Sequence, residues 1–162
     1  MANNCAFNMK ITGFRNEADR KLISDMFDIG YNRRKKLPVE LSHRIYESLV
    51  EDQEDGSIVI YGDCAWSVRT ALREQFQPVR TTDGAECISI EELSRRYGVT
   101  IEYYSEELGM EFQEHCIIRG GNAETDGETH VEEHYPLGPD GEEDDSQEAY
   151  KIGGYGDWEW HI

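Results

Sequence analysis

The chain has 162 residues, a mass of 18.7 kDa and a formal net charge of −18 at pH 7. This length fits one domain with a hydrophobic core, or one domain with a long acidic appendage, better than two full domains. Apolar residues make up 38%, below the roughly 45–50% of compact globular chains, a range that also counts glycine. We therefore expect part of the chain to stay solvated.

The excess negative charge lies in the second half of the chain. Residues 1–81 contain 12 Lys and Arg against 12 Asp and Glu, whereas residues 82–162 contain 4 against 22. Such a charge repels nucleic-acid phosphates and anionic lipid, and it favours basic protein surfaces. We therefore expect a protein partner, with no direct contact to nucleic acid or membrane.

Targeting signals and cysteine patterns point to the cytoplasm. No stretch approaches the roughly 20 apolar residues of a membrane span, and a basic segment followed by an apolar core is missing at the N-terminus. The four cysteines are scattered among apolar or small neighbours without a CxxC pair. We expect them to be reduced and mostly buried.

A strand followed by a helix is predicted at the start of the chain. Residues 5–12 alternate between apolar and polar side chains, the period of a half-buried strand. Asn16 is suited to cap a helix whose apolar residues recur from Ala18 to Ile29. Gly30 then offers a left-handed stop.

A basic cluster and two strands are predicted next. Residues 33–36 are Arg-Arg-Lys-Lys, which we interpret as a solvated loop, with nucleic-acid contact or pairing with the acidic half as alternatives. Residues 45–50 and 57–61 read as antiparallel strands joined by a turn at 54–56.

Two helices are predicted in the middle of the chain. Residues 66–76 have a mostly helical apolar pattern, and we expect Trp66 to lie in the core. A better-marked helix begins at Ser89, which forms a capping box with Glu92, and it ends at Gly98.

The rest of the chain is predicted to consist of strands and one acidic hairpin or loop. Residues 99–103 and 110–118 read as strands on either side of a turn at 108–109. Residues 122–146 are rich in Asp and Glu and have no Lys or Arg, which predicts a mobile hairpin or loop. The bulky residues at 155–162 indicate a chain end tied into the sheet.

This order of elements predicts an α+β fold. We expect a ferredoxin-like antiparallel sheet with helices packed on one face, extra C-terminal strands and an acidic loop or hairpin. The chain is then a single ferredoxin-like domain, residues 1–162, with an acidic mobile insertion at 122–146.

Four segments resemble a known family: MANNC at 1–5, GDCAWS at 62–67, SEELGMEFQEH at 105–115 and GGYGDW at 153–158. They are similar to the YubB-like, or Api92-like, ferredoxin-fold proteins of phages and plasmids. The resemblance spans most of the chain and implies a ferredoxin-like fold and a mobile-element origin. That family supplies no catalytic signature, so no functional residues are carried over.

Metal binding is the most specific chemical function that the sequence suggests. His130 and His134, with Glu132 and Glu133, bring imidazole and carboxylate groups close together, and residues four apart share a face in a helix or a strand. Because these weak candidates sit in a Gly- and Glu-rich stretch, we expect no metal and no cofactor.

Catalysis is not indicated. Carboxylates are so common here that any pair of them is uninformative. Cys116 follows His115, but adjacent residues on a strand point to opposite faces, so we expect a core cysteine and not a nucleophile. Trp158 and Trp160 are expected to pack in the core, with an aromatic interface patch as the alternative.

The acidic surface is the strongest functional lead. Carboxylates on a folded scaffold imitate a nucleic-acid backbone and fit the basic channel of a nuclease. The predicted partner-binding residues are Glu102, Glu106, Glu107, Glu111, Glu114, Glu124, Glu128, Glu132, Glu133, Glu142, Glu143, Asp144 and Asp145.

We therefore expect a non-enzymatic protein from a mobile element, located in the cytoplasm of the host cell. It would bind and inhibit a host nucleic-acid-binding defence protein, in the manner of an anti-CRISPR or anti-restriction decoy. The second hypothesis is a structural or assembly module that self-associates, and the third is a metal-dependent enzyme. Carboxylates that only confer solubility are the remaining explanation.

Overall fold

The first predicted strand forms the centre of the structure. The computed structural model of the chain describes residues 3–30, 33–76, 80, 81 and 83–162. The alternation in β1 (Asn4–Thr12) buries every second side chain, and Cys5, Phe7, Met9 and Ile11 are at most 1% exposed. β1 pairs antiparallel with β6 (Ile58–Ala65) on one side and with β8 (Thr100–Glu107) on the other.

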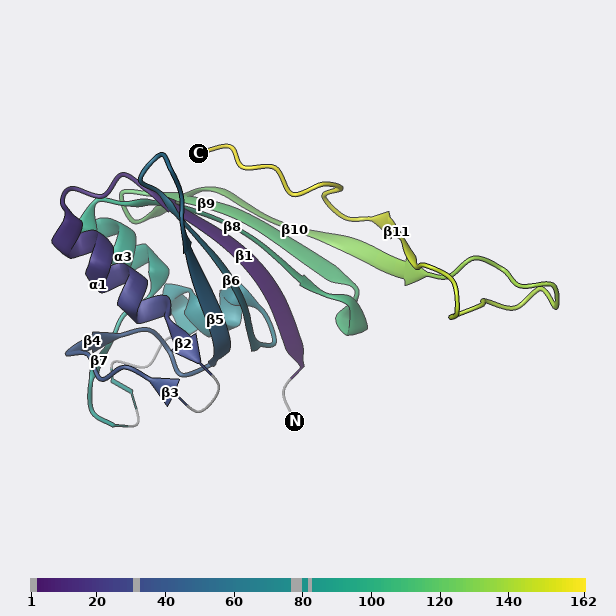
Figure 1. Cartoon of the computed structure of the whole chain (residues 1–162), viewed down its shortest axis with the longest axis horizontal. Helices are drawn as coiled ribbons and strands as arrows, with labels where there is room; N and C mark the ends of the chain where they lie inside the picture. Colours follow the sequence, from purple (N-terminus) through teal and green to yellow (C-terminus); the bar gives the residue numbers. More distant parts are fainter. Residues whose placement is uncertain (1–2, 31–32, 77–79, 82) are drawn as a thin grey trace.

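These strands belong to a nine-stranded sheet of order β11-β10-β9-β8-β1-β6-β5-β2-β3 (Figure 1). The remaining strands are β2 (Ile29–Gly30), β3 (Arg33–Arg34), β5 (Ile45–Asp52), β9 (Phe112–Arg119), β10 (Asn122–His134) and β11 (Tyr150–Gly153). Neighbours in this sheet pair antiparallel. A separate two-stranded parallel sheet joins β4 (Val39–Glu40) to β7 (Glu86–Cys87). The expected α+β class with a large antiparallel sheet is confirmed.

Three helices pack on one face of the large sheet: α1 (Glu17–Phe27), α2 (Val68–Leu72) and α3 (Ile90–Tyr97). Their buried residues join the inward residues of the strands in one apolar core. The predicted N-caps are confirmed, because the side chain of Asn16 accepts from Asp19 N and that of Ser89 from Glu92 N. The carboxylate of Glu92 pairs with Arg95 and Arg96, so only the Ser89 half of the predicted capping box is present. Gly98 ends α3 with φ +69°, a left-handed conformation that glycine adopts without strain.

Two helix predictions need correction. The first helix ends at Phe27, and Gly30 belongs to β2, where Ile29 pairs with Ser48 of β5. The predicted helix 66–76 is only the five-residue α2 followed by the 3₁₀ turn η1 (Glu74–Phe76). β6 runs on to Ala65, and Trp66 turns the chain with φ +62° and is 47% exposed, so it does not lie in the core.

The first 13 residues of the acidic stretch 122–146 form a strand. Of the expected hairpin or loop, the loop is wrong for residues 122–134, which form β10. β10 pairs antiparallel with β11 as a hairpin, and residues 135–149 connect the two strands. Thr125, Thr129 and Val131 supply β-branched side chains that favour a strand. Pairing with β9 overrides the high charge of the segment.

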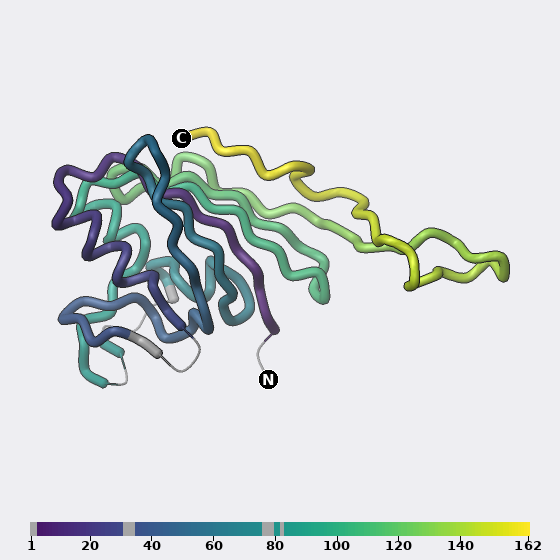
Figure 2. The backbone as a smooth tube through the Cα atoms, in the orientation of Figure 1, coloured from purple at the N-terminus to yellow at the C-terminus, as the bar shows by residue number. Residues whose placement is uncertain are grey.

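The last residues cross the sheet face opposite the helices. Residues 154–162 have no strand pairing, and in Figure 2 they run back along the sheet above β10, β9 and β8. The chain end is therefore attached to the face of the sheet and is not one of its strands. Hydrogen bonds such as that from the Lys10 side chain, Nζ, to Ile162 O (3.1 Å) hold it there.

The cysteines are buried, and part of the basic cluster forms a strand. All four cysteines are buried free thiols, as expected. The cluster at 33–36 is not wholly a loop, because Arg33–Arg34 form β3; their side chains lie outside the described part. Lys35 pairs with Asp25 (2.7 Å) and Asp28 (3.2 Å), both in the first half of the chain. Within the described residues, no helix is long and apolar enough to span a membrane.

Candidate functional site

The predicted partner-binding carboxylates divide into buried and exposed groups. Glu102, Glu107 and Glu114 are 0%, 8% and 2% exposed. The prediction that these three glutamates lie on a partner-binding surface is therefore wrong, because their carboxylates contact other groups of the chain. Successive side chains of a strand point to opposite faces of the sheet. Both faces of β8 and β9 are covered, one by the helices and the other by residues 154–162, so each of these three glutamates is buried, whichever face it points to.

Glu114 caps the short helix α2. Its carboxylate accepts the backbone N–H groups of Val68 (2.9 Å) and Arg69 (3.2 Å), and the Ser105 hydroxyl also donates to it. Burial raises the pKa of Glu114, and the hydrogen bonds from Ser105, Val68 and Arg69 oppose that rise. This glutamate is a structural acceptor for the first turn of α2.

Glu106 and Glu107 hold the end of β8. Glu107 accepts the backbone N–H of Gly109 (2.9 Å) in η2 (Leu108–Met110). Glu106 accepts from Gln113 Nε2 (2.7 Å) and pairs with Lys151 of β11 (2.7 Å). Glu106 therefore links the central sheet to its outermost acidic strand.

The other predicted acidic residues do reach the surface, on β10 and beyond it. The exposed ones are Glu111, Glu124, Glu128, Glu133, Glu142, Glu143 and Asp145, and the half-buried ones are Glu132 and Asp144. Most of them lie in one segment that extends past the body of the protein.

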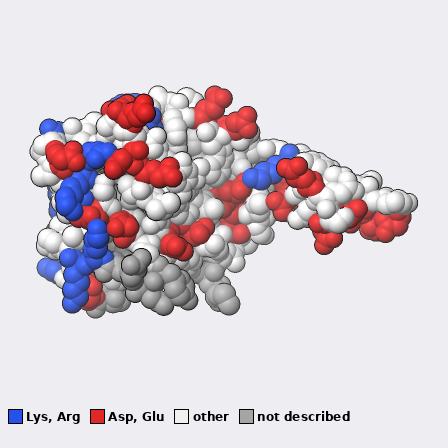
Figure 3. All heavy atoms as spheres, in the orientation of Figure 1, with Lys and Arg blue, Asp and Glu red and all other residues white. Residues whose placement is uncertain are grey.

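We call residues 131–153 the arm. It consists of the end of β10, the connection 135–149 and β11, and it extends from the body as a narrow projection (Figure 1). It contains eight Asp and Glu and only one basic residue, Lys151. In the face seen in Figure 3, acidic side chains occupy the tip of the arm, whereas Lys and Arg gather at the helical end of the molecule.

Backbone hydrogen bonds order the arm. β10 and β11 pair from Val131 opposite Gly153 to His134 opposite Tyr150. Within the connection, Gly138 N donates to Glu142 O (2.8 Å) and Asp144 N to Pro136 O (2.9 Å). The carboxylates of the arm are thus displayed by a hairpin with its own backbone hydrogen bonds.

Of the two histidines singled out in the sequence, His134 lies on the arm and His130 directly precedes it on β10. Glu132 lies between them and accepts from His130 Nε2 and from His134 Nε2, both at 2.9 Å, while His134 Nδ1 lies 2.8 Å from Glu143 Oε1. Glu132 raises the pKa of both histidines, and they lower the pKa of Glu132. Glu133, which points to the other face of the strand, is not part of this cluster.

A second cluster lies where residues 154–162 cover the sheet. Tyr104 of β8 stacks on His115 of β9, with ring centroids 4.2 Å apart, and on Trp158 at 5.4 Å. Beside this stack, Glu102 Oε2 lies 2.7 Å from His115 Nε2 and 2.8 Å from His161 Nδ1. Burial opposes ionisation of Glu102, but hydrogen bonds from both histidines outweigh it and lower the pKa of the carboxyl.

His115 and Cys116 lie on opposite faces of β9, as expected. Cys116 is fully buried on the helix side, in contact with Arg73, whereas His115 faces residues 154–162. Trp158 and Trp160 are half-buried over the sheet, so the expectation that they pack in the core is wrong. No periodic signal points to the cluster at Glu102, because its members are far apart in the sequence.

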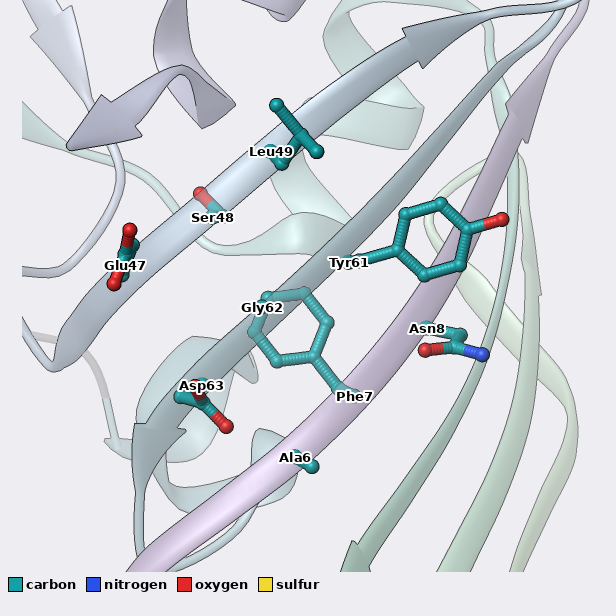
Figure 4. Close-up of a pocket in the computed structure, with 9 residues that line it drawn as sticks. All are labelled: Ala6, Phe7, Asn8, Glu47, Ser48, Leu49, Tyr61, Gly62 and Asp63. Carbon is teal, nitrogen blue, oxygen red and sulfur yellow. The ribbon is translucent and has the colours of Figure 1, made fainter.

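Part of the same sheet face stays uncovered. Between β1, β6 and β5 there is a hollow of about 340 Å³, shown in Figure 4. Leu49 and Tyr61 line it and are 59% and 41% exposed, and Glu47 and Asp63 flank it. Burial and the neighbouring Glu47 raise the pKa of Asp63.

An ion-pair network on the helix side was also missed by sequence reasoning. Arg73 is 8% exposed; its Nε lies 3.0 Å from Glu91 Oε1 and its Nη1 lies 3.2 Å from Asp126 Oδ1. Arg69 also pairs with Asp126 (2.8 Å). These contacts tie β10 to α2 and α3.

Among the described residues, three groups have ligand atoms close enough to share a metal ion. They are Glu102 with His115 and His161, Glu40 with His43 and Asp83, and Glu111 with His130 and Glu132. Only the first combines two histidines with a carboxylate.

Comparison with known proteins gives no relative. No family model matches the chain, and searches of curated proteins and of solved structures give no match either.

Proposed function

We propose that this protein acts by binding, and that its arm docks into the basic groove of a nucleic-acid-binding protein. The observation that carries the proposal is the ordered projection of eight acidic residues with a single lysine. Unlike a loose acidic tail, a hairpin with internal hydrogen bonds has its carboxylates positioned before it meets a partner. Such preorganisation lowers the entropy lost on binding.

The arm also exposes apolar side chains. Leu137, Tyr150 and Ile152 are 68%, 49% and 52% exposed. Carboxylates that only served solubility would not need large apolar neighbours, whereas protein interfaces combine an apolar centre with a polar rim. This mixture supports a protein partner over a purely solubilising role.

The partner class follows from the charge. A row of carboxylates competes with phosphates for Lys and Arg, so the best-matched partner is a protein that binds nucleic acid. In its concrete form the proposal is a decoy from a mobile element that inhibits a host defence protein, such as a CRISPR effector or a restriction nuclease. The segments that resemble phage and plasmid proteins favour this form.

A ferredoxin-like core is part of the proposal. The central strands have the order β8-β1-β6-β5, with α1 between β1 and β5 and α3 between β6 and β8. Two interleaved β-α-β units in an antiparallel sheet support that assignment. The strands β9, β10 and β11 then extend the core at one edge and lead into the arm.

The test is an affinity capture from host lysate at low salt with a charge-neutralised arm. The arm variant carries Glu133→Gln, Glu142→Gln, Asp145→Asn and Glu148→Gln. The control removes four exposed charges from the body with Glu17→Gln, Glu51→Gln, Glu54→Gln and Glu74→Gln. We expect the wild type and the control to capture a nucleic-acid-binding protein that added salt or DNA displaces, and the arm variant to lose it. Equal capture by both variants would exclude the arm as the binding site.

Self-association is the second candidate function. It rests on the hollow between β1, β6 and β5, where Leu49 and Tyr61 stay exposed on an uncovered sheet face. Light scattering over a range of concentrations separates the two candidates. A monomer at all concentrations excludes self-association, whereas an oligomer that salt does not dissociate and that Leu49→Asp disrupts supports it.

A further inference from the structure

Three metal-ligating groups converge on the sheet face opposite the helices. Glu102 comes from β8, His115 from β9 and His161 from the segment that crosses both strands. Their ligand atoms lie within 4.8 Å of one another. We propose that Glu102, His115 and His161 bind a divalent transition-metal ion, and that zinc suits this ligand set.

The type of ligand supports zinc. Imidazole nitrogen and carboxylate oxygen are both ordinary zinc ligands, and two histidines with one carboxylate leave a fourth position open for water. Hard cations such as Mg²⁺ and Ca²⁺ prefer sites built from oxygen atoms. The pair of imidazoles therefore favours a transition metal.

The carboxylate is held in place before any metal binds. Glu102 is completely buried, and its Oε1 accepts the backbone N–H groups of His161 (2.6 Å) and Ile162 (3.3 Å). These bonds leave Oε2 directed at the two rings. Hydrogen bonds to the non-ligating oxygen are the outer-shell support that metal-binding carboxylates commonly have.

His115 is also fixed. It is 9% exposed, and its ring lies nearly parallel to that of Tyr104, with 10° between the planes. Tyr104 in turn donates a hydrogen bond to Glu159 O (2.9 Å). Two of the three ligands thus need no ordering when the ion binds.

The third ligand provides access from solvent. The side chain of His161 is 60% exposed, so an ion reaches the cluster without opening the sheet. The distances from Glu102 Oε2 to the two imidazole nitrogens are 2.7 and 2.8 Å. Ligand atoms around a tetrahedral zinc are roughly 3.3 Å apart, given bonds near 2.0 Å, so binding needs only a small outward rotation of the rings.

The alternative is a purely structural cluster in which both rings donate hydrogen bonds to Glu102 and no metal binds. Measuring metal binding separates the metal site from this structural cluster. The histidines of β10 provide a matched control, since His130 and His134 also bracket a glutamate.

The experiment is calorimetric titration of zinc into protein purified without a histidine tag and treated with a chelator. The variants are His161→Ala and Glu102→Gln, with His130→Ala/His134→Ala as the control. His161 is the decisive position, since its exposed side chain can be removed without emptying the core. Circular dichroism checks that each variant is folded.

We expect one equivalent of zinc to bind the wild type and the control. Loss of a ligand should weaken binding at least as much as loss of an outer-shell partner, roughly 10–100-fold. Cobalt should give visible absorption bands that disappear in the His161→Ala variant. The proposal is overturned if the wild type binds no zinc, if His161→Ala and Glu102→Gln leave the affinity unchanged, or if only the His130→Ala/His134→Ala variant loses binding.

Discussion

Trp158 stacks on Tyr104 with 5.4 Å between the ring centroids and 11° between the ring planes. This contact joins residues 54 positions apart and places the segment 154–162 on the face of the sheet that the helices leave open. The cluster of Glu102, His115 and His161 exists only because this segment lies there.

Replacing Trp158 with alanine should lower the free energy of unfolding by about 1–3 kcal/mol. An aromatic pair contributes ~0.5–1.5 kcal/mol beyond its buried area. Replacing a completely buried tryptophan with alanine would cost ~3–5 kcal/mol, and Trp158 is only half-buried. Urea denaturation measures the difference. Trp66→Ala is the control, since Trp66 is 47% exposed and Arg44 lies 5.8 Å from its ring; it should cost under ~1 kcal/mol. A larger loss for Trp66 than for Trp158 would contradict this prediction.

Replacing Arg73 with methionine should destabilise the fold by about 3–5 kcal/mol, because it leaves a buried carboxylate without its cation. Glu91 is 8% exposed and lies 3.0 Å from the guanidinium. Equilibrium unfolding in urea gives the loss. The double variant Arg73→Met/Glu91→Met should be more stable than the single one, since it removes both charges. A single-variant loss below ~1 kcal/mol, as for a surface pair, would exclude a buried ion pair here.

Replacing Glu132 with glutamine should lower the pKa of His130 and His134 towards 6.5. In the wild type, the raised pKa values of the two histidines contribute stability to the folded protein that is fully present below pH 6.5. This contribution is lost as the pH rises through the raised pKa values. Glu132 contributes above pH 4.5 and loses its contribution as the pH falls through its lowered pKa.

An NMR titration of the histidine ring protons measures these pKa values. The same spectra check that the Glu132→Gln variant keeps the wild-type fold. Unchanged pKa values for His130 and His134 in the variant would show that Glu132 does not raise them.

Replacing Gly62 with alanine should cost about 1–3 kcal/mol through overpacking. A Cβ atom at this position would lie 2.7 Å from Phe7 Cζ and 2.8 Å from Glu47 O. Thermal or urea unfolding tests the prediction. The cost should be smaller when Phe7→Leu is already present, because part of the clash is then removed. Equal costs in both backgrounds would show that Phe7 is not the obstacle.

The sequence by itself determined the local elements. The apolar alternation of β1, the caps at Asn16 and Ser89, and the stop at Gly98 were all predicted, because strand and helix periods and capping hydrogen bonds involve residues close in the chain. It also located the negative charge in the second half. β10 was missed, since its charged residues resemble a loop until β9 pairs with them.

Only the tertiary structure decided which carboxylates face solvent and which groups meet. Glu102, Glu107 and Glu114 looked like surface charges in the sequence, but they are buried because both faces of β8 and β9 are covered. Glu102 and His161 are 59 positions apart, and no local pattern connects them. Strand pairing and the return of the chain end across the sheet bring such groups together, and these long-range packing interactions have no period in the sequence.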